Sequence, residues 1–210
     1  MHGTALKATV VIAILALTSC GVTPSSETGK NAEAVETKSP VAQGPITGKT
    51  AFWEMYKSAR AWSSDIVPLS LESKEIPGIK NADGKAAMWS ASFGSPKLHQ
   101  FRTFSYSIAA SKPDIIQGIM IGNTKPWNGP VNDAMAVDPS DLMVDSDTAF
   151  QTALAQAAAW VRKNPGKDAS FTLGNASRFP APVWYVLWGD KKSGYAVYVN
   201  AKTGTVVKIK

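Results

Sequence analysis

Two stretches of the chain, about 98 residues apart, carry the same amphipathic pattern, and any fold must accommodate both. One begins at Thr50-Ala51-Phe52 and ends at Trp62, and the other begins at Thr148-Ala149-Phe150 and ends at Trp160. Their apolar residues recur every three to four positions, the spacing of one helical face. The matching positions are 52, 55, 56, 59 and 62 against 150, 153, 154, 157 and 160. The sequence therefore predicts two equivalent amphipathic helices.

Each predicted helix is followed by segments typical of antiparallel strands. Residues 67–73 correspond to 169–175, and the extended segments 88–93 and 183–188 correspond in turn. Turns are expected at 94–96 and 189–192, followed by alternating strands near 101–106 and 195–199. The chain closes with a hairpin turn at 200–204 and a strand at 205–209. This order predicts an α+β fold of two helix-plus-antiparallel-sheet repeats.

The predicted organisation has five parts. Residues 21–48 are rich in Ser, Thr, Gly, Pro and charge and contain no aromatic residue, which is typical of a flexible tether. Residues 122–146 are rich in Pro, Asn, Asp and Gly and would connect the two repeats. The expected parts are a signal peptide at 1–19, a tether at 20–48, a first repeat at 49–121, a connector at 122–146 and a second repeat at 147–210.

The start of the chain resembles a bacterial lipoprotein signal. Lys7 precedes an apolar run from Ala8 to Leu17, which is too short for a bilayer-spanning helix of about 20 residues. Leu17-Thr18-Ser19-Cys20 then resembles the lipobox, which is cleaved before the cysteine after lipid is attached to it. Cys20 is the only cysteine of the chain, and two or three acyl chains would hold it permanently at a membrane. Gly21 follows in place of an aspartate, so the resemblance favours the outer membrane of an exported envelope protein.

The C-terminal strands resemble the end of a PepSY domain. Residues 183–186 lead through 195–199 to Asn200-Ala201-Lys202-Thr203-Gly204, close to the family's "VDAxTG", with Asn200 in place of the aspartate. The resemblance covers about residues 147–210, and the first half shares it only through the repeat. It implies a non-catalytic, exported or membrane-tethered module similar in fold to the β-lactamase inhibitor protein. Some PepSY modules restrain peptidases and others belong to signalling or assembly proteins.

Charge and residue types narrow the chemistry that the chain can perform. The formal net charge of +6 falls to about +5 without Lys7, but the lysines are scattered and not interleaved with aromatic residues, so no nucleic-acid partner is expected. Past the signal there is one histidine, His99, predicted to lie in a turn or at the surface. Cysteine and histidine ligands for zinc are missing, as is a glycine-rich phosphate loop. We expect no metal, no cofactor and no catalytic residue.

Five aspartates gather in the connector and at the start of the second helix. Glycosidases and calcium sites use such groups, but the spacing does not fit an EF-hand loop. A solvated connector is favoured, with Ser146 or Asp147 capping the second helix and Thr148 with Gln151 forming a capping box. A carboxylate-dependent envelope hydrolase remains the alternative. The residues are Asp133, Asp138, Asp141, Asp145 and Asp147.

The tryptophans divide into two groups. Six lie at repeat-matched or strand positions, and most of them are predicted to be core: Trp53, Trp62, Trp89, Trp160, Trp184 and Trp188. Trp127 lies in the Pro/Gly loop 125–130, where it either anchors a partner or fills a core. The leading hypothesis is a binding module for a protein, peptide or envelope polymer that uses Trp127 and the sheet face away from the helices. A structural assembly lipoprotein is a further alternative.

Overall fold

The two amphipathic segments form the two long helices of the described structure. In the computed structural model, which describes residues 44–111, 113–130, 132 and 134–208, α1 spans Gly48–Trp62 and α2 spans Ser146–Lys163. Each helix buries one stripe, as the spacing of its apolar residues predicts. The prediction of two amphipathic helices is confirmed. The buried residues of the stripes are Ala51, Phe52, Met55 and Ala59 in α1 and Ala149, Ala153 and Ala157 in α2.

Most of the six tryptophans pack in or against the core, as predicted, and Trp53 is the exception. Trp53 is 38% exposed, because it follows the buried Phe52 by one residue and so points about 100° away around the helix. Three of the others are buried, and two are half-buried against the core. The buried ones are Trp89, Trp184 and Trp188, and the half-buried ones are Trp62 and Trp160.

Each helix is followed by four main strands, of which the sequence predicts all but the fourth strand after α1. After α1 come β2 (Val67–Lys74), β4 (Met88–Ser95), β5 (Gln100–Ser107) and β6 (Gly118–Pro126). After α2 come β8 (Ala169–Ala176), β9 (Val183–Trp188), β10 (Tyr195–Asn200) and β11 (Val206–Val207). Short elements complete the described part: β1 (Ile46–Thr47), β3 (Lys85–Ala86), β7 (Ala134–Met135) and the 3-10 turn η1 (Pro139–Asp141).

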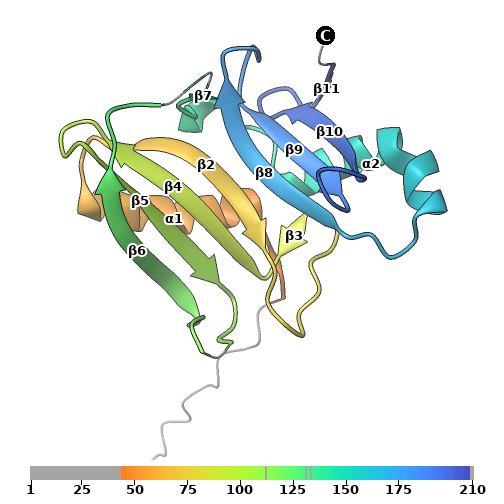
Figure 1. Ribbon diagram of the computed structural model, residues 1–210, viewed down its shortest axis with the longest axis horizontal. Coiled ribbons are helices and arrows are strands. Elements are labelled where there is room, and N and C mark those ends of the chain that lie inside the picture. The colour runs from red at the N-terminus through yellow and green to blue at the C-terminus, as the bar shows by residue number, and fades with distance from the viewer. Residues whose placement is uncertain (1–43, 112, 131, 133, 209–210) are drawn as a thin grey trace, which may run out of the picture. The chain divides into compact units, whose positions relative to one another are not determined.

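The long strands join into one antiparallel sheet. Among the described residues the sheet has nine strands, in the order β11-β10-β9-β8-β2-β4-β5-β6, with β7 paired to β8. β1 and β3 form a separate two-stranded pair. Both helices lie behind the same face of the sheet (Figure 1), and they leave the other face, here called the outer face, without a helix. The fold is mixed α and β with a large antiparallel sheet.

Three expected boundaries are corrected by the structure. Residues 46–48, placed in the flexible tether, form β1 and the start of α1, because Ile46 pairs with β3 and packs against the core. The connector was expected from residue 122, but β6 continues to Pro126 because it pairs with β5 as far as Gln100. The turn expected at 94–96 lies at 96–99, since Gly94 and Ser95 still pair with β5.

The two halves meet through residues that the sequence alignment had matched. β2 pairs with β8 at the centre of the sheet, where Leu71 lies opposite Leu173, and both are buried. The rings of Trp89 and Trp184 are 6.2 Å apart between centroids. Each indole donates a hydrogen bond to the carbonyl two residues before a helix: Trp89 to Ile46 O at 3.0 Å and Trp184 to Val144 O at 2.9 Å. A single hydrophobic core therefore contains residues of both halves.

The N-termini of the two helices share one set of capping groups. Thr47 precedes α1 but gives it no side-chain cap. Instead the Gly48 N–H donates to Ser146 Oγ at 2.7 Å, and the Lys49 N–H donates to Asp145 Oδ1 at 2.8 Å. The same Asp145 oxygen accepts from the Ser146 N–H at 2.6 Å and so caps α2 as well. A carboxylate between two helix N-termini also offsets their partial positive charges.

This arrangement corrects the predicted cap of α2. The N-cap is Asp145, so Thr148 lies inside the first turn and forms no capping box with Gln151. Asp147 accepts only from its neighbour Thr148, at the N–H and the hydroxyl. The close approach also explains Gly48, because a Cβ there would lie 2.6 Å from a ring atom of Trp184.

We expect Asp145→Ala to lower the free energy of unfolding by about 2 kcal/mol, because it removes the acceptor of two helix N-termini and a single cap contributes about 1 kcal/mol. Urea denaturation followed by tryptophan fluorescence measures the change. Asp147→Ala is the matched control, with an expected loss below about 1 kcal/mol. Equal losses in the two variants would contradict the shared cap.

Candidate functional site

Trp127 lies directly after β6, where the Pro/Gly loop ends the strand. Its N–H donates to His99 O at 2.9 Å, which ties the loop to the turn between β4 and β5. Its ring lies against the backbone of Gly94, where a Cβ would stand only 2.7 Å from the ring atoms. Gly94 therefore acts as a seat for the indole on the side of β4 opposite Phe93. The ring is half-buried, so the loop both packs and leaves indole surface accessible.

An open cavity of about 330 Å³ adjoins the tryptophan. This volume falls in the range of small-molecule and side-chain pockets, and the walls are largely carbon. Asn128 and His99 are the residues with polar side chains among those that line it. Other lining residues are Val67, Pro96, Trp127, Pro130 and Ala136. The cavity can hold an apolar side chain or ring, with few polar groups to orient it.

The turn 96–99, which forms one wall of the cavity, is held by Asp65. One Asp65 carboxylate oxygen accepts from the Ser63 and Ser95 hydroxyls at 2.6 Å and 2.7 Å, and the other accepts from the Lys97 N–H at 2.7 Å. These donors, with the Ser63 hydroxyl first, lower the pKa of Asp65 to about 2. His99 adopts a left-handed backbone with φ 51°, so this turn is under steric constraint.

His99 lies in a turn, as the sequence predicts. The sequence identified Trp127 as a candidate binding residue. It did not identify Pro96 and Val67 as residues that line the cavity beside it. The available signal was the Gly94-Ser95-Pro96 triplet, which marks a turn but does not tell which loop covers it.

The connector aspartates Asp138 and Asp141 each make their own hydrogen bonds or ion pair. Asp138 accepts from the N–H and the hydroxyl of Ser140, and these bonds, the hydroxyl first, lower its pKa. Asp141 forms an ion pair with Lys202 at 2.7 Å. The hydrogen bond to Asp141 and the charge of its carboxylate raise the pKa of Lys202. Asp133 lies outside the described residues. Among those that are described, no group of three or more His, Cys, Asp and Glu side chains could hold a metal.

A larger, more polar cavity lies elsewhere. It measures about 880 Å³ and lies between the loop 75–81 and the start of β8, away from Trp127. Lys80 and Asp168 form an ion pair across it at 3.2 Å, and both side chains are largely exposed. The pair links the loop to the other half of the sheet.

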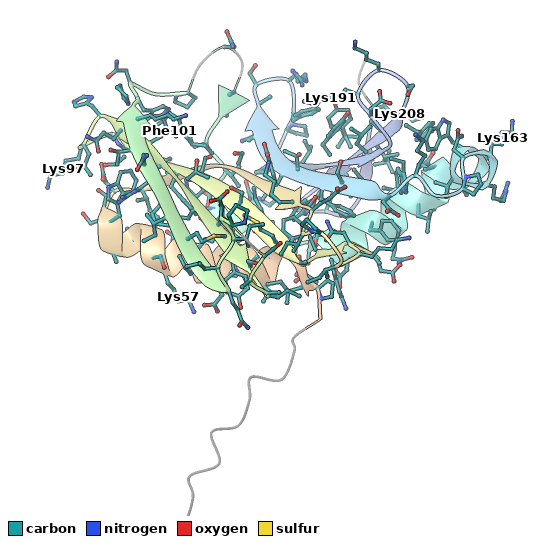
Figure 2. The ribbon with its side chains drawn as sticks, turned by 60° about the horizontal axis from the view of Figure 1, so that its bottom comes forward. Lys57, Lys97, Phe101, Lys163, Lys191 and Lys208 are labelled. Atoms are coloured by element: carbon teal, nitrogen blue, oxygen red, sulfur yellow. The ribbon has the colours of Figure 1, made fainter. Side chains whose placement is uncertain are left out.

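Two further features concern membranes and charge. No helix within the described ranges is long and apolar enough to cross a bilayer. Cys20, the predicted lipid-attachment residue, lies outside those ranges together with the predicted signal peptide. In Figure 2 the labelled Lys97 and Lys163 lie on opposite sides of the view and Lys191 lies between them, so these basic side chains are spread apart.

Comparisons with known proteins add a single structural likeness. No family model matches the chain, and no curated protein matches it in sequence. The chain is similar to the crystal structure of a "putative lipoprotein" from Clostridium difficile 630, with 11% sequence identity and a TM-score of 0.47. The alignment covers 76% of this chain and 91% of that one. A likeness this low transfers neither fold family nor function, and the PepSY resemblance stays a prediction.

We expect Asp65→Asn to change the pH dependence of stability. The folded-state pKa of about 2 lies below the ordinary 3.8, so the carboxylate stabilises the fold above about pH 4 and loses this contribution as the pH falls through about 2. The stability difference between wild type and Asp65→Asn should therefore be constant from neutral pH to about pH 5 and shrink below it. Denaturation at a series of pH values measures it.

Ser95→Ala provides a second arm of this test. It removes one hydroxyl donor to Asp65 and should weaken the same pH dependence without abolishing it. A difference between wild type and Asp65→Asn that persists unchanged to pH 2 would contradict the assignment.

Proposed function

We propose that this chain is a non-catalytic, exported lipoprotein that serves as a binding module in the cell envelope. In this proposal Cys20 carries the lipid, residues 21–43 act as a tether, and a tandem of two PepSY-like units presents the binding surface. The partner is a protein or peptide that inserts an apolar side chain beside Trp127. Restraint of a peptidase is one form that such binding could take.

The observation that carries the proposal is the apolar cavity beside Trp127. The main-chain N–H of Trp127 is held by His99 O and its indole packs on Gly94, so the side chain is well positioned as an anchor. Tryptophan is enriched among the residues that dominate binding energy at interfaces. The cavity is open and mostly carbon-lined, with few polar groups at its rim. This combination favours an apolar side chain over a charged ligand.

The position of the cavity supports the same proposal. Both helices cover one face of the sheet, while Gly94 seats Trp127 on the other. A partner at Trp127 can therefore extend over the outer face without displacing a helix. The outer face also agrees with a role that needs a broad surface more than a closed cleft.

The carboxylate-dependent hydrolase finds less support. Such an enzyme needs one carboxyl group with a raised pKa as general acid. The connector aspartates Asp138 and Asp145 are instead acceptors for hydroxyl and N–H donors of their own loop and helices. An assembly lipoprotein is a narrower form of the binding role and differs from it in the permanence of the complex.

Cys20→Ala should release the protein from membranes, since attachment by two or more acyl chains would be lost. Fractionation of cells without detergent, with metabolic labelling by a fatty acid, measures the change. The variant should appear in the soluble exported fraction and carry no label. Retention of the unlabelled variant in the membrane pellet would contradict lipid anchoring.

Trp127→Ala should reduce partner capture about tenfold or more, the loss expected of a dominant anchor. A photo-crosslinking amino acid at Asn128, on the cavity rim, reports capture in intact cells. Trp53→Ala is the matched control, because Trp53 is an exposed tryptophan of α1 on the other side of the sheet. Its capture should equal that of wild type.

A probe at Lys57, an exposed residue of α1, controls for nonspecific crosslinking. Thermal melting establishes that both tryptophan variants are folded. Equal capture by Trp127→Ala and wild type, or equal crosslinking at Lys57 and Asn128, would refute the proposed site.

A further inference from the structure

The register of the sheet places one continuous row of side chains on the outer face. Glu72 of β2 lies opposite Thr172 of β8, Thr172 lies opposite Tyr185 of β9, and Tyr185 lies opposite Tyr198 of β10. Residues directly opposite each other in a sheet share a face. The neighbouring row, Leu71, Leu173, Trp184 and Val199, is buried against the helices. The row with the tyrosines is therefore the one on the outer face.

Three aromatic rings form a platform at the end of this row. The ring centroids of Tyr185 and Tyr198 are 5.0 Å apart, and those of Tyr198 and Phe179 are 5.3 Å apart. All three side chains are half-buried, so the rings support each other and still present surface. Partial burial is the larger cause, and the charge of Tyr198 the smaller cause, of a raised pKa of the Tyr185 hydroxyl. The hydroxyl therefore remains a hydrogen-bond donor at neutral pH.

A cavity of about 260 Å³ adjoins the platform. Glu72, Thr172, Tyr185 and Tyr198 all line it. Gly174 forms part of its floor, and a Cβ at that position would meet no atom within 4 Å. The cavity is small for a drug-sized ligand and suits a single six-membered ring with part of the next.

The charges around the platform select among ligands that stack on aromatic rings. The Glu72 carboxylate already pairs with Lys74 at 2.6 Å, and Lys191 also lines the cavity. A cationic ligand would therefore meet a site without excess negative charge. Arg178 and Asn175 line the cavity as well, and the Arg178 guanidinium lies 4.8 Å from the centroid of the Phe179 ring. The hydroxyls of Thr172, Tyr185 and Tyr198 and the carboxylate of Glu72 can exchange hydrogen bonds with alcohols. A pyranose ring matches this set, because its C–H face is apolar and its edge carries hydroxyls.

We propose that the platform of Tyr185, Tyr198 and Phe179 binds a saccharide, whose ring stacks on Tyr185 and Tyr198 and whose hydroxyls meet Glu72 and Thr172. The ligand class is a neutral or acidic glycan of the kind exposed on envelope polymers. This goes beyond the proposed protein partner at Trp127 and rests on the proposed function only in placing the chain in the envelope.

Saturation-transfer NMR with the full-length protein in a sugar-free zwitterionic detergent tests the proposal. The probes are chitotriose and cellotriose, with the peptide Gly-Lys-Gly as a cationic comparison. We expect saturation transfer to a saccharide, and a loss of affinity of at least about fivefold in Tyr185→Ala and Tyr198→Ala. Tyr185→Phe keeps the ring and should retain binding within about twofold of wild type, since stacking is the dominant contact.

A second variant guards against loss of folding. Gly174→Val adds a side chain in open space without removing any packing, so it should fold normally and block the cavity. Trp127→Ala should leave saccharide binding unchanged, which separates this site from the proposed partner site. Absence of transfer from folded wild type, preference for the peptide, or binding unaffected by Gly174→Val and Tyr185→Ala would each overturn the proposal.

Discussion

The carboxylate of Asp145 holds together the part of the structure on which the rest depends, the point where the two helices begin. Four N–H groups at the start of any helix lack partners within it, and burial of such groups without acceptors is costly. Here α1 has no cap of its own, and Asp145 and Ser146 supply its acceptors from the start of α2. The carboxylate also lies where the positive ends of both helix dipoles converge. The N-terminus of α1 is therefore complete only in the presence of the other half of the chain.

This junction determines the form of the sheet. With the helix N-termini fixed side by side, Trp89 and Trp184 meet beneath them and Leu71 pairs with Leu173 in the neighbouring strands. The sheet is therefore continuous across the two halves, and its helix-covered face forms a single core. Within the described ranges, the opposite face has no helix over it. It carries the solvent-facing side chains of each strand. In the connector after Pro126, the short strand β7 pairs with β8. Trp127, at the start of the connector, lies over Gly94 at the border of that face.

Local patterns in the sequence predicted the elements well, and long-range contacts explain the errors. Amphipathic spacing placed both helices, and alternation placed β9 within its observed bounds of Val183–Trp188. The hairpin turn at 200–204 followed from its composition, and Asn200 holds it by accepting from the N–H groups of Lys202 and Thr203. The capping of α1 by Asp145 could not be predicted, because the donor, the Lys49 N–H, lies 96 residues away in sequence. Trp127 was recognisable as a loop residue, but the seat on Gly94 and the wall at Pro96 depend on tertiary packing.

The outer face is where the two halves differ most, although their scaffolds match. Ser90 follows Trp89 as Tyr185 follows Trp184, and each faces a cross-strand neighbour, Ser105 in the first half and Tyr198 in the second. Ser105 donates a hydrogen bond to Ser90 at 3.1 Å, while the two tyrosine rings contact each other at an angle of 44°. At this pair of positions the first half carries small hydroxyl side chains, whereas the second half carries aromatic rings that form a platform. Cross-strand pairs contribute to stability on either face, so stability alone does not require this difference. A tandem scaffold with one polar and one aromatic outer surface can bind an asymmetric ligand in a single orientation, because the two halves offer it different contacts.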